Sequence, residues 1–370
     1  MKILLINSKN HWTHGWFTSP SDLKTAINVL HKAGIEVTTT EVENIVQLEK
    51  TLDELSSDTL VWSNAYFVDD ENNKVVWLNE YLENRNLPFV GSDSKTLQSV
   101  LKKDVCQAIL KENQSPIPFF TLITRENIHE IDTLISQFSD YPYPLVLKPT
   151  AESGSIGVCL AKNQEEVKEY TSQILNDFPH SDVIIEEFLP SDDITCGYLQ
   201  LGNDVLLLPT AYIVKSVPGK NNILNRQERL RSWDKDDKIQ PYISDEAILS
   251  QLKTHIAPIA KALNVQGITR IDGRLDKEGT LRFFDVNGLP ALGFPDGVMV
   301  KQCITCFPNY SEMEVFEGLI HTIALNAFLQ HGIEAPEILQ KHNLFTMDSD
   351  IIIRSKIVDN KDSKQNLVIQ

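Results

Sequence analysis

Apolar runs alternate with amphipathic segments along the first ninety-five residues. Residues 2–7 contain the apolar run Ile-Leu-Leu-Ile at 3–6 and predict a buried strand. The next amphipathic segment has Ser21 placed to cap its start and Gly34 to end it. The elements predicted here are strands at 2–7, 36–40, 59–62 and 88–91, and helices at 21–33 and around 74–84. This alternation predicts a small parallel α/β domain over residues 1–95.

Beyond residue 94 the pattern predicts further helices and strands, which are antiparallel from the strand at 183–188 to about residue 212. The predicted helices are 94–112, 128–138, 164–176, 245–263 and 312–329, and the predicted strands are 119–123, 145–148, 158–161, 183–188, 267–275, 281–286 and one within 351–358. A turn at 202–204 joins antiparallel segments that reach residue 212. Residues 215–239 are polar with little periodicity and predict a long loop of the kind that often forms a lid. The predicted units are residues 1–95, 96–190, 191–345 and a C-terminal extension, 346–370.

Composition narrows the class of protein. The 370 residues are 42% hydrophobic and carry 34 Lys and Arg against 51 Asp and Glu, a net charge of −17. This charge argues against binding to nucleic acid or to an anionic membrane. No apolar run reaches membrane-spanning length and the first residues carry no secretion signal, so we expect a cytoplasmic protein. Cys303 and Cys306 form a CxxC pair without a second pair, which favours reduced, partly buried thiols over a zinc or redox site.

A lysine and a Gly/Ser loop follow the strand predicted at 145–148. Lys148 ends this strand, and the loop runs from Glu152 through Ser153, Gly154 and Ser155 to Gly157. Such a loop can fold over phosphates because glycine allows close backbone approach and hydroxyls add donors. On this motif alone, an ordinary hairpin loop beside a surface lysine is an equal alternative.

Polar residues alternate along two adjacent predicted strands. Residues two apart share a face, so Arg270, Asp272 and Arg274 lie together on one strand, and Asp285 and Asn287 lie together on the next. Two carboxylates and an amide oxygen suit Mg²⁺, and the arginines can neutralise phosphate charge. The alternative is an exposed sheet face that carries salt bridges.

A third segment combines an apolar strand with an acidic end. Residues 183–189 place Glu186 and Glu187 directly before Phe188 and Leu189, with Asp193 four residues later. In a nucleotide site, such a segment can bind adenine through its backbone and ribose through a carboxylate. By itself it is a weak indicator, because acidic strand ends are common.

In this order and spacing, the three segments resemble the ATP-grasp superfamily, and within it the D-alanine–D-alanine ligase group, from about Lys102 to Phe328. The resemblance implies an α/β (α+β) fold in which the small N-terminal parallel domain is followed by two α+β subdomains that clasp ATP. It implies that Lys103, or its neighbour Lys102, binds ATP, and it assigns catalysis to Arg270, Lys148 and Ser155. The implied ATP-binding residues are Lys103, Lys148, Glu152, Ser153, Gly154, Ser155, Gly157, Glu186, Glu187, Phe188, Leu189 and Asp193. The implied metal ligands are Asp272, Asp285 and Asn287, where the family usually has Glu at the place of Asp285.

The two segments that would contact the substrates differ in sequence from those of the D-alanine–D-alanine ligase group. The first loop carries His11, Trp12, His14 and Trp16, which either reshape the site of the first substrate or are purely structural. On the acceptor side, Asp296 stands where the ligases hold a carboxylate with serine, so we expect it to repel a carboxylate. The lid offers three arginines. The predicted substrate contacts are Arg274, Asp296, Gly297 and Arg231.

The predicted activity is that of an ADP-forming carboxylate–amine ligase that works through an acyl phosphate. The resemblance implies ATP and Mg²⁺ as cofactors, two ions of Mg²⁺ with Mn²⁺ as an alternative, and small-molecule acid and amine substrates. A carrier protein as acceptor and a homodimer are left open. The alternatives are a D-alanine–D-alanine or D-lactate ligase, an ATP-grasp kinase, and a nucleotide-binding module without turnover.

Overall fold

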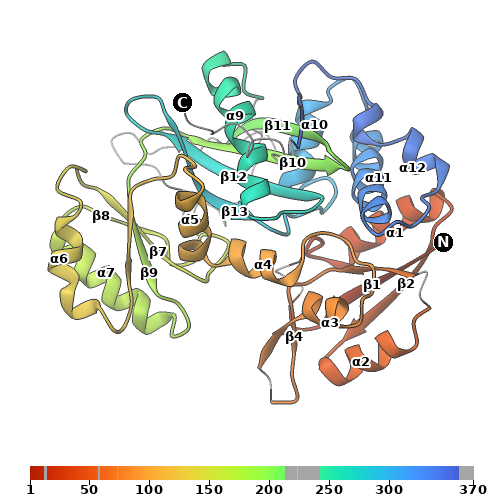
Figure 1. The fold of residues 1–370 in the computed structure, drawn as a ribbon, viewed down its shortest axis with the longest axis horizontal. Coiled ribbons are helices and arrows are strands. Elements are labelled where there is room, and N and C mark those ends of the chain that lie inside the picture. The colour runs from red at the N-terminus through yellow and green to blue at the C-terminus, as the bar shows by residue number, and fades with distance from the viewer. Residues whose placement is uncertain (12–14, 57–58, 73, 213–222, 224–241, 358–370) are drawn as a thin grey trace, which may run out of the picture.

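The N-terminal domain of the computed structural model contains a three-stranded parallel sheet with the order β2-β1-β3 (Figure 1). The structure describes residues 1–11, 15–56, 59–72, 74–212, 223 and 242–357. The strands are β1 (Lys2–Ser8), β2 (Glu36–Val42) and β3 (Thr59–Ser63), and the helices are α1 (Pro20–Lys32), α2 (Ile45–Asp53) and α3 (Leu78–Asn84). Six of the seven residues of β1 are buried, as expected for the central strand of a parallel sheet. The predicted parallel α/β domain is therefore confirmed.

Three local predictions in this domain were wrong. The N-cap of α1 is Ser19, not Ser21, and its hydroxyl accepts a hydrogen bond from the Asp22 N–H. The segment predicted as a helix around 74–84 begins instead with strand β5 (Val75–Trp77), which pairs with β4 (Phe67–Asp69), and α3 starts only after it. The strand predicted at 88–91 amounts to one isolated bridge between Val61 and Phe89.

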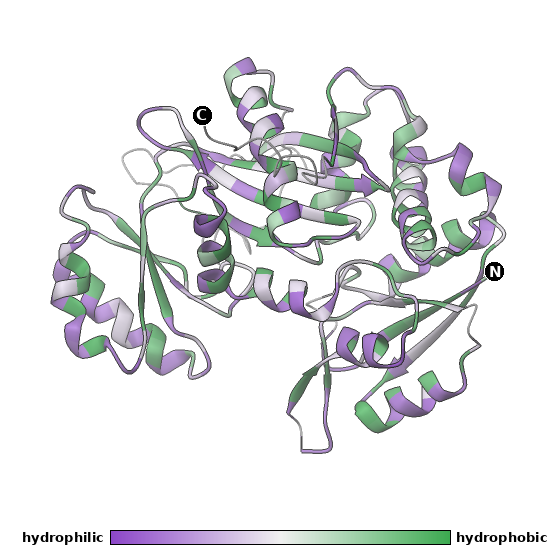
Figure 2. Ribbon diagram, in the orientation of Figure 1, coloured by the Kyte–Doolittle hydropathy of each residue, from purple (hydrophilic) through white to green (hydrophobic). Residues whose placement is uncertain are grey.

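The next subdomain is built on a four-stranded sheet with the order β6-β9-β7-β8. Its strands are β6 (Phe120–Ile123), β7 (Leu145–Pro149), β8 (Cys159–Ala161) and β9 (Val183–Glu187), and its helices are η2 (Ile128–Glu130), α6 (Ile131–Ser136) and α7 (Gln164–Asp177). All four strands pair antiparallel. Figure 2 shows α7 as a helix with both apolar and polar residues, and its buried residues pack onto the sheet.

The helix predicted over 94–112 is broken into α4 (Ser94–Leu101) and α5 (Lys103–Glu112). Lys102 has a ψ of 104°, which ends one helix and starts the other. The N–H of Lys103 then bonds to the Thr150 carbonyl at 3.0 Å. This hydrogen bond connects the start of α5 to the residue that follows β7.

The largest sheet has five strands in the order β13-β12-β10-β11-β14, and all of its pairs are antiparallel. Its strands are β10 (Asp193–Leu201), β11 (Asp204–Tyr212), β12 (Ile268–Leu275), β13 (Leu281–Asn287) and β14 (Ile353–Lys356). The associated helices are α9 (Glu246–Ala262), α10 (Val298–Cys306), α11 (Glu312–Gln330), α12 (Glu337–Lys341) and η3 (Leu344–Thr346). Helix α9 packs in one apolar cluster with this sheet, and α10 and α11 pack in another, so the sheet is covered on both faces.

Helix α11 joins the N-terminal domain to this large sheet. It packs against α1, and Lys32 forms an ion pair with Glu317 at 2.8 Å.

The strand β14, from the predicted C-terminal extension, adds to the edge of the large sheet beside β11. Helix α10, which was not predicted, buries the free thiols of Cys303 and Cys306. The division of the chain at residues 95, 190 and 345 stays a prediction.

Within the described part of the chain, every helix is too short or too polar to cross a lipid bilayer.

Candidate active site

A cavity of about 450 Å³ lies where the four-stranded and five-stranded sheets face each other. The tips of the N-terminal domain close it with Gly15, Thr18 and Tyr66. Of the predicted site residues, those that line the cavity are Lys103, Lys148, Glu152, Ser153, Gly154, Ser155, Glu186, Glu187, Phe188, Leu189, Asp193, Arg270, Asp272, Arg274, Asp285, Asn287 and Asp296. Arg231 and the rest of the predicted lid, apart from residue 223, lie outside the described residues.

Two lysines enter this cavity from different elements. Lys148, on β7, forms a buried ion pair with Glu186, and its ammonium lies 4.5 Å from the centroid of the Phe284 ring. Lys103, at the start of α5, donates to the carbonyl oxygen of Glu152. Burial lowers the pKa of Lys103, and the charge of Asp285 opposes this shift. Lys102 is exposed, so of the two candidates only Lys103 faces the cavity.

The Gly/Ser loop takes its shape from left-handed backbone. Gly154, Ser155 and Gly157 have φ values of 64°, 58° and 70°. This region of backbone conformation is favourable for glycine and uncommon for serine. A Cβ on Gly157 would lie 2.8 Å from Phe178 and 2.9 Å from Pro149. Gly157 therefore permits the close packing at the end of the loop, whereas residues 152–155 form the cavity wall.

The hinge, residues 186–193, joins the four-stranded sheet to the five-stranded sheet and lines the cavity. Burial raises the pKa of Glu186, partly opposed by Lys148, and its Oε1 atom is buried without a hydrogen-bond partner in the described residues. Asp193 pairs with the guanidinium of Arg274, which also donates to the Leu189 carbonyl at 3.2 Å. Arg274, predicted as a substrate contact, thus lies with the hinge residues and the Asp193 carboxylate.

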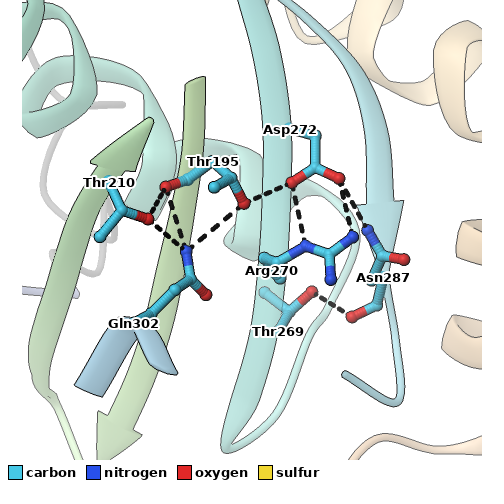
Figure 3. A network of polar contacts seen from close by, with 7 residues as sticks. All are labelled: Thr195, Thr210, Thr269, Arg270, Asp272, Asn287 and Gln302. Atoms are coloured by element: carbon cyan, nitrogen blue, oxygen red, sulfur yellow. Dashed lines mark hydrogen bonds and ion pairs between the residues drawn. The ribbon is translucent and has the colours of Figure 1, made fainter. Parts of the chain in front are cut away.

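The predicted metal ligands lie side by side on β12 and β13. Asp272 is directly opposite Asp285, and Arg270 is opposite Asn287, with a bulge after Asp272. Asp272 accepts hydrogen bonds from Thr195 at 2.6 Å, from Arg270 at 3.0 and 2.9 Å, and from Asn287 at 3.3 Å (Figure 3). The same-face placement expected from strand alternation is confirmed.

Asp285 is the group in this set best suited to a cation. Within the described residues it makes no hydrogen bond or ion pair, and it lines the cavity. Its charge contributes to raising the pKa of Glu186 and opposes the lowering of the pKa of Lys103. Oxygen ligands of this kind suit a hard divalent ion, so the side chains present fit Mg²⁺. Two carboxylates and one amide make up the set; the described residues contain no cluster of three or more His, Cys, Asp or Glu arranged for a metal.

The acceptor side differs from the prediction in its charge. Asp296 forms an ion pair with Lys301 at 2.9 Å, in which the side chain of Asp296 is 83% exposed and that of Lys301 is 21% exposed. Lys301 lines the cavity and was not foreseen. The expected repulsion of a carboxylate by Asp296 assumed an isolated charge, and Lys301 offsets that charge. Gly297 does not line the cavity: it precedes α10, where a Cβ would lie 2.6 Å from the Gly293 nitrogen.

The first loop contributes less chemistry than its aromatic residues suggested. Trp16 is fully buried and packs edge-on against Trp62, with ring centroids 6.4 Å apart, which favours the structural alternative for this residue. His11 lies 3.0 Å from a carboxylate oxygen of Asp69. Trp12 and His14 lie outside the described residues.

Two further residues of the cavity were missed. The Tyr66 hydroxyl accepts a hydrogen bond from the Leu289 N–H at 2.9 Å, and Tyr66 follows the carboxyl end of β3, a position where parallel sheets often place ligand contacts. Thr195, on β10, contacts Asp272, and only its place two residues after Asp193 on the same strand face could have indicated it.

Together, these subdomains and their shared cavity define an ATP-grasp fold. The sequence model of the family described as "D-ala D-ala ligase C-terminus" matches residues 109–305, more than half of the chain, and the chain belongs to this family. The D-alanine–D-alanine ligase of Aquifex aeolicus is 28% identical over 211 residues, which are 57% of this chain and 66% of that protein. The enzyme of the same name from Coprothermobacter proteolyticus is 27% identical over 267 residues, 70% of this chain and 79% of that protein. The crystal structure of the Bacillus anthracis D-alanine–D-alanine ligase complexed with ATP aligns with a TM-score of 0.61 at 16% identity, over 90% of this chain and 99% of that one.

Proposed function

We propose that this protein is an ATP-dependent carboxylate–amine ligase that forms an amide bond through an acyl phosphate and releases ADP and phosphate. The observation that carries the proposal is that Lys103 of α5 and Lys148 of β7 meet Arg270, Asp272, Asp285 and Asn287 of the large sheet around one cavity. The relatives named above are ligases, and one was solved with ATP bound, which supports ATP as the cosubstrate. The match to the Aquifex ligase covers 66% of the length of that protein and 57% of the length of this chain.

In the proposed reaction, the protein binds and orients the reactants and stabilises charge. Lys148 and Lys103 neutralise phosphate oxygens, and residues 152–155 provide backbone and hydroxyl donors around them. The adenine is proposed to lie at the segment from Glu186 to Leu189, where the buried Oε1 of Glu186 has no hydrogen-bond partner among the described residues. When bound, Mg²⁺ neutralises the charge of the phosphates. Asp272, Asp285 and Asn287 would hold it, and Arg270 lies beside them to stabilise the acyl-phosphate oxygens.

The acid and amine substrates are proposed to enter from the end of the cavity lined by Thr18, Tyr66, Asp296 and Lys301. The carboxylate of the acid attacks the γ-phosphorus of ATP, ADP leaves, and the amine then displaces phosphate from the acyl carbon. We place this chemistry in the cytoplasm and propose small-molecule substrates, with a carrier-protein amine as an alternative acceptor.

A test of this function measures ADP release with Mg²⁺ over paired pools of carboxylic acids and amines. The proposal predicts turnover that requires an acid and an amine together and stops when the metal is chelated. Turnover with a hydroxyl compound alone would show a kinase instead, and nucleotide binding without any ADP release would show a binding module.

D-alanine–D-alanine ligase activity is the second candidate, because the relatives carry that name and the Asp296–Lys301 pair leaves the acceptor end without a bare negative charge. D-alanine supplied alone distinguishes it. Saturable ADP release with D-alanine as both acid and amine, at about 1 s⁻¹ or faster, establishes this candidate. A preference for a mixed pair of substrates establishes the first.

A further inference from the structure

A buried chain of hydrogen bonds runs from helix α10 to the Asp272 carboxylate. Its members are Gln302 on α10, Thr210 on β11 and Thr195 on β10 (Figure 3). Gln302 is 1% exposed, Thr210 is fully buried and Thr195 is 3% exposed. These three polar side chains lie between the apolar face of α10 and the sheet, where a polar group is retained only with partners.

The direction of every hydrogen bond in this chain is fixed by its chemistry. The Gln302 Nε2 atom lies 3.1 Å from the Thr195 carbonyl oxygen, which can only accept, so the amide nitrogen and not the amide oxygen faces the threonines. The same nitrogen lies 2.9 Å from the Thr210 Oγ1 and 3.4 Å from the Thr195 Oγ1. The amide nitrogen has two protons for these three acceptors, so its long contact with the Thr195 Oγ1 is one branch of a shared hydrogen bond, and both hydroxyl oxygens accept. The Thr210 proton is directed to the Thr195 carbonyl at 3.0 Å.

The Thr195 hydroxyl donates its proton to the Asp272 carboxylate, which can only accept. It donates to Oδ1 of Asp272 at 2.6 Å, a short contact typical of a hydroxyl that donates to a carboxylate. Arg270 also donates to Asp272, through Nε to the same Oδ1 and through Nη2 to Oδ2. Arg270 is itself a candidate for phosphate contacts, whereas the Thr195 hydroxyl is bound to the Asp272 carboxylate and to the buried chain.

From this geometry we propose that Thr195 is a positioning residue, oriented by Gln302, that keeps the Asp272 carboxylate in the orientation needed to bind the divalent cation. The proposal rests on the proposed function, because it concerns the same metal site. A positioning role also gives a reason for a polar side chain at position 302. The Gln302 Oε1 is buried without a hydrogen-bond partner in the described residues, which is unfavourable and which an apolar side chain would avoid. Polar side chains that orient metal ligands typically affect metal affinity by about 10- to 100-fold when they are removed.

The experiment measures the dissociation constant of Mn²⁺ in the presence of ADP, by electron paramagnetic resonance of free Mn²⁺ and by calorimetry. Thr195→Val removes the hydroxyl and keeps the shape, and we expect Mn²⁺ to bind about 10- to 100-fold more weakly. Thr195→Ser retains the hydroxyl and should restore binding close to wild type. Gln302→Met should give a smaller loss than Thr195→Val, because the hydroxyl remains but is no longer oriented.

The matched control is Thr322→Val on α11. Thr322 is equally buried, donates to the Gly318 carbonyl at 2.7 Å and accepts from the Leu344 N–H at 3.0 Å, remote from the cavity. It should lower the melting temperature without changing Mn²⁺ affinity. Wild-type Mn²⁺ affinity in Thr195→Val, or equal losses in the Ser and Val variants, would overturn the positioning role alone. A wild-type protein that binds ADP but no Mn²⁺ would overturn the proposed function and this role with it.

Discussion

Replacing Asp285 by asparagine should separate activity from stability. The substitution keeps the size of the side chain and removes one charge that has no hydrogen bond or ion pair in the described residues. The negative charge of Asp285 stabilises the protonated form of Lys103 and destabilises the ionised form of Glu186. Its contributions to the free energy of folding through these two residues therefore have opposite signs. We expect the free energy of unfolding to change by less than about 1 kcal/mol.

The effect on turnover should be much larger. A carboxylate that holds the cation beside the transferred phosphate stabilises charge that develops during the reaction, and its loss should slow turnover by at least about a thousandfold. At about 1.36 kcal/mol for each factor of ten, this corresponds to about 4 kcal/mol of lost transition-state stabilisation. The assay is steady-state ADP release at saturating ATP and Mg²⁺, with thermal unfolding measured on the same preparation.

A matched control lies on the same hairpin. Asp276, at the turn between β12 and β13, accepts hydrogen bonds from the N–H groups of Glu278 and Thr280 at 3.0 and 2.8 Å, and from Arg282 at 2.9 Å. Asp276→Asn should lower stability by about 1–3 kcal/mol and leave turnover of the folded protein unchanged. The reasoning is refuted if Asp285→Asn turns over normally, or if it loses as much stability as Asp276→Asn.

Three further predictions concern the nucleotide loop, the lysines and a pH effect. Lys103→Ala should weaken the binding of an ATP analogue by about tenfold or more, whereas Lys102→Ala should not, and equal losses in calorimetry would contradict the assignment. Backbone amides of residues 152–157 should gain hydrogen-exchange protection when an ATP analogue and Mg²⁺ are added, and unchanged exchange would count against closure over the phosphates. Hydrogen bonds from Asn10 and then His11 lower the pKa of Asp69, so the stability that this carboxylate adds is present above its unfolded pKa, near 4, and is lost as the pH falls through the folded value. Asp69→Asn should therefore destabilise at pH 7 by about 1 kcal/mol and by less at pH 3, and an equal effect at both values in denaturant titrations would refute this.

Strand alternation placed the candidate residues on one face of the sheet, and the glycine-rich spacing placed the candidate loop at the cavity, because both patterns are local. Arg270, Asp272, Asp285 and Asn287 come from two strands joined by a short turn, so the period of two fixed their common face. The long helices and the parallel N-terminal sheet followed from periodicity for the same reason. The break at Lys102 could not be foreseen, because it depends on a hydrogen bond from Lys103 to Thr150, 47 residues later.

The missed residues are those whose roles depend on contacts distant in the sequence. Thr195 meets Asp272 across 77 positions, and Tyr66 meets Leu289 across 223. Strand β5 was taken for the start of a helix and β4 was not predicted, since three-residue strands carry too few positions for a period to show. Lys301 lies on α10, and because that helix was not predicted, its pairing with Asp296 was missed and the acceptor end was predicted to be more negative than it is.

The formation of an acyl phosphate is the central claim, and trapping it with hydroxylamine tests it most directly. Hydroxylamine attacks acyl phosphates to give stable hydroxamates, so it can replace the natural amine. With ATP, Mg²⁺, a carboxylic acid that supports turnover and hydroxylamine, the account predicts hydroxamate in equal amount to ADP, and none in the Asp285→Asn variant. ADP release without hydroxamate, under conditions in which added acyl phosphate is trapped, would contradict the account.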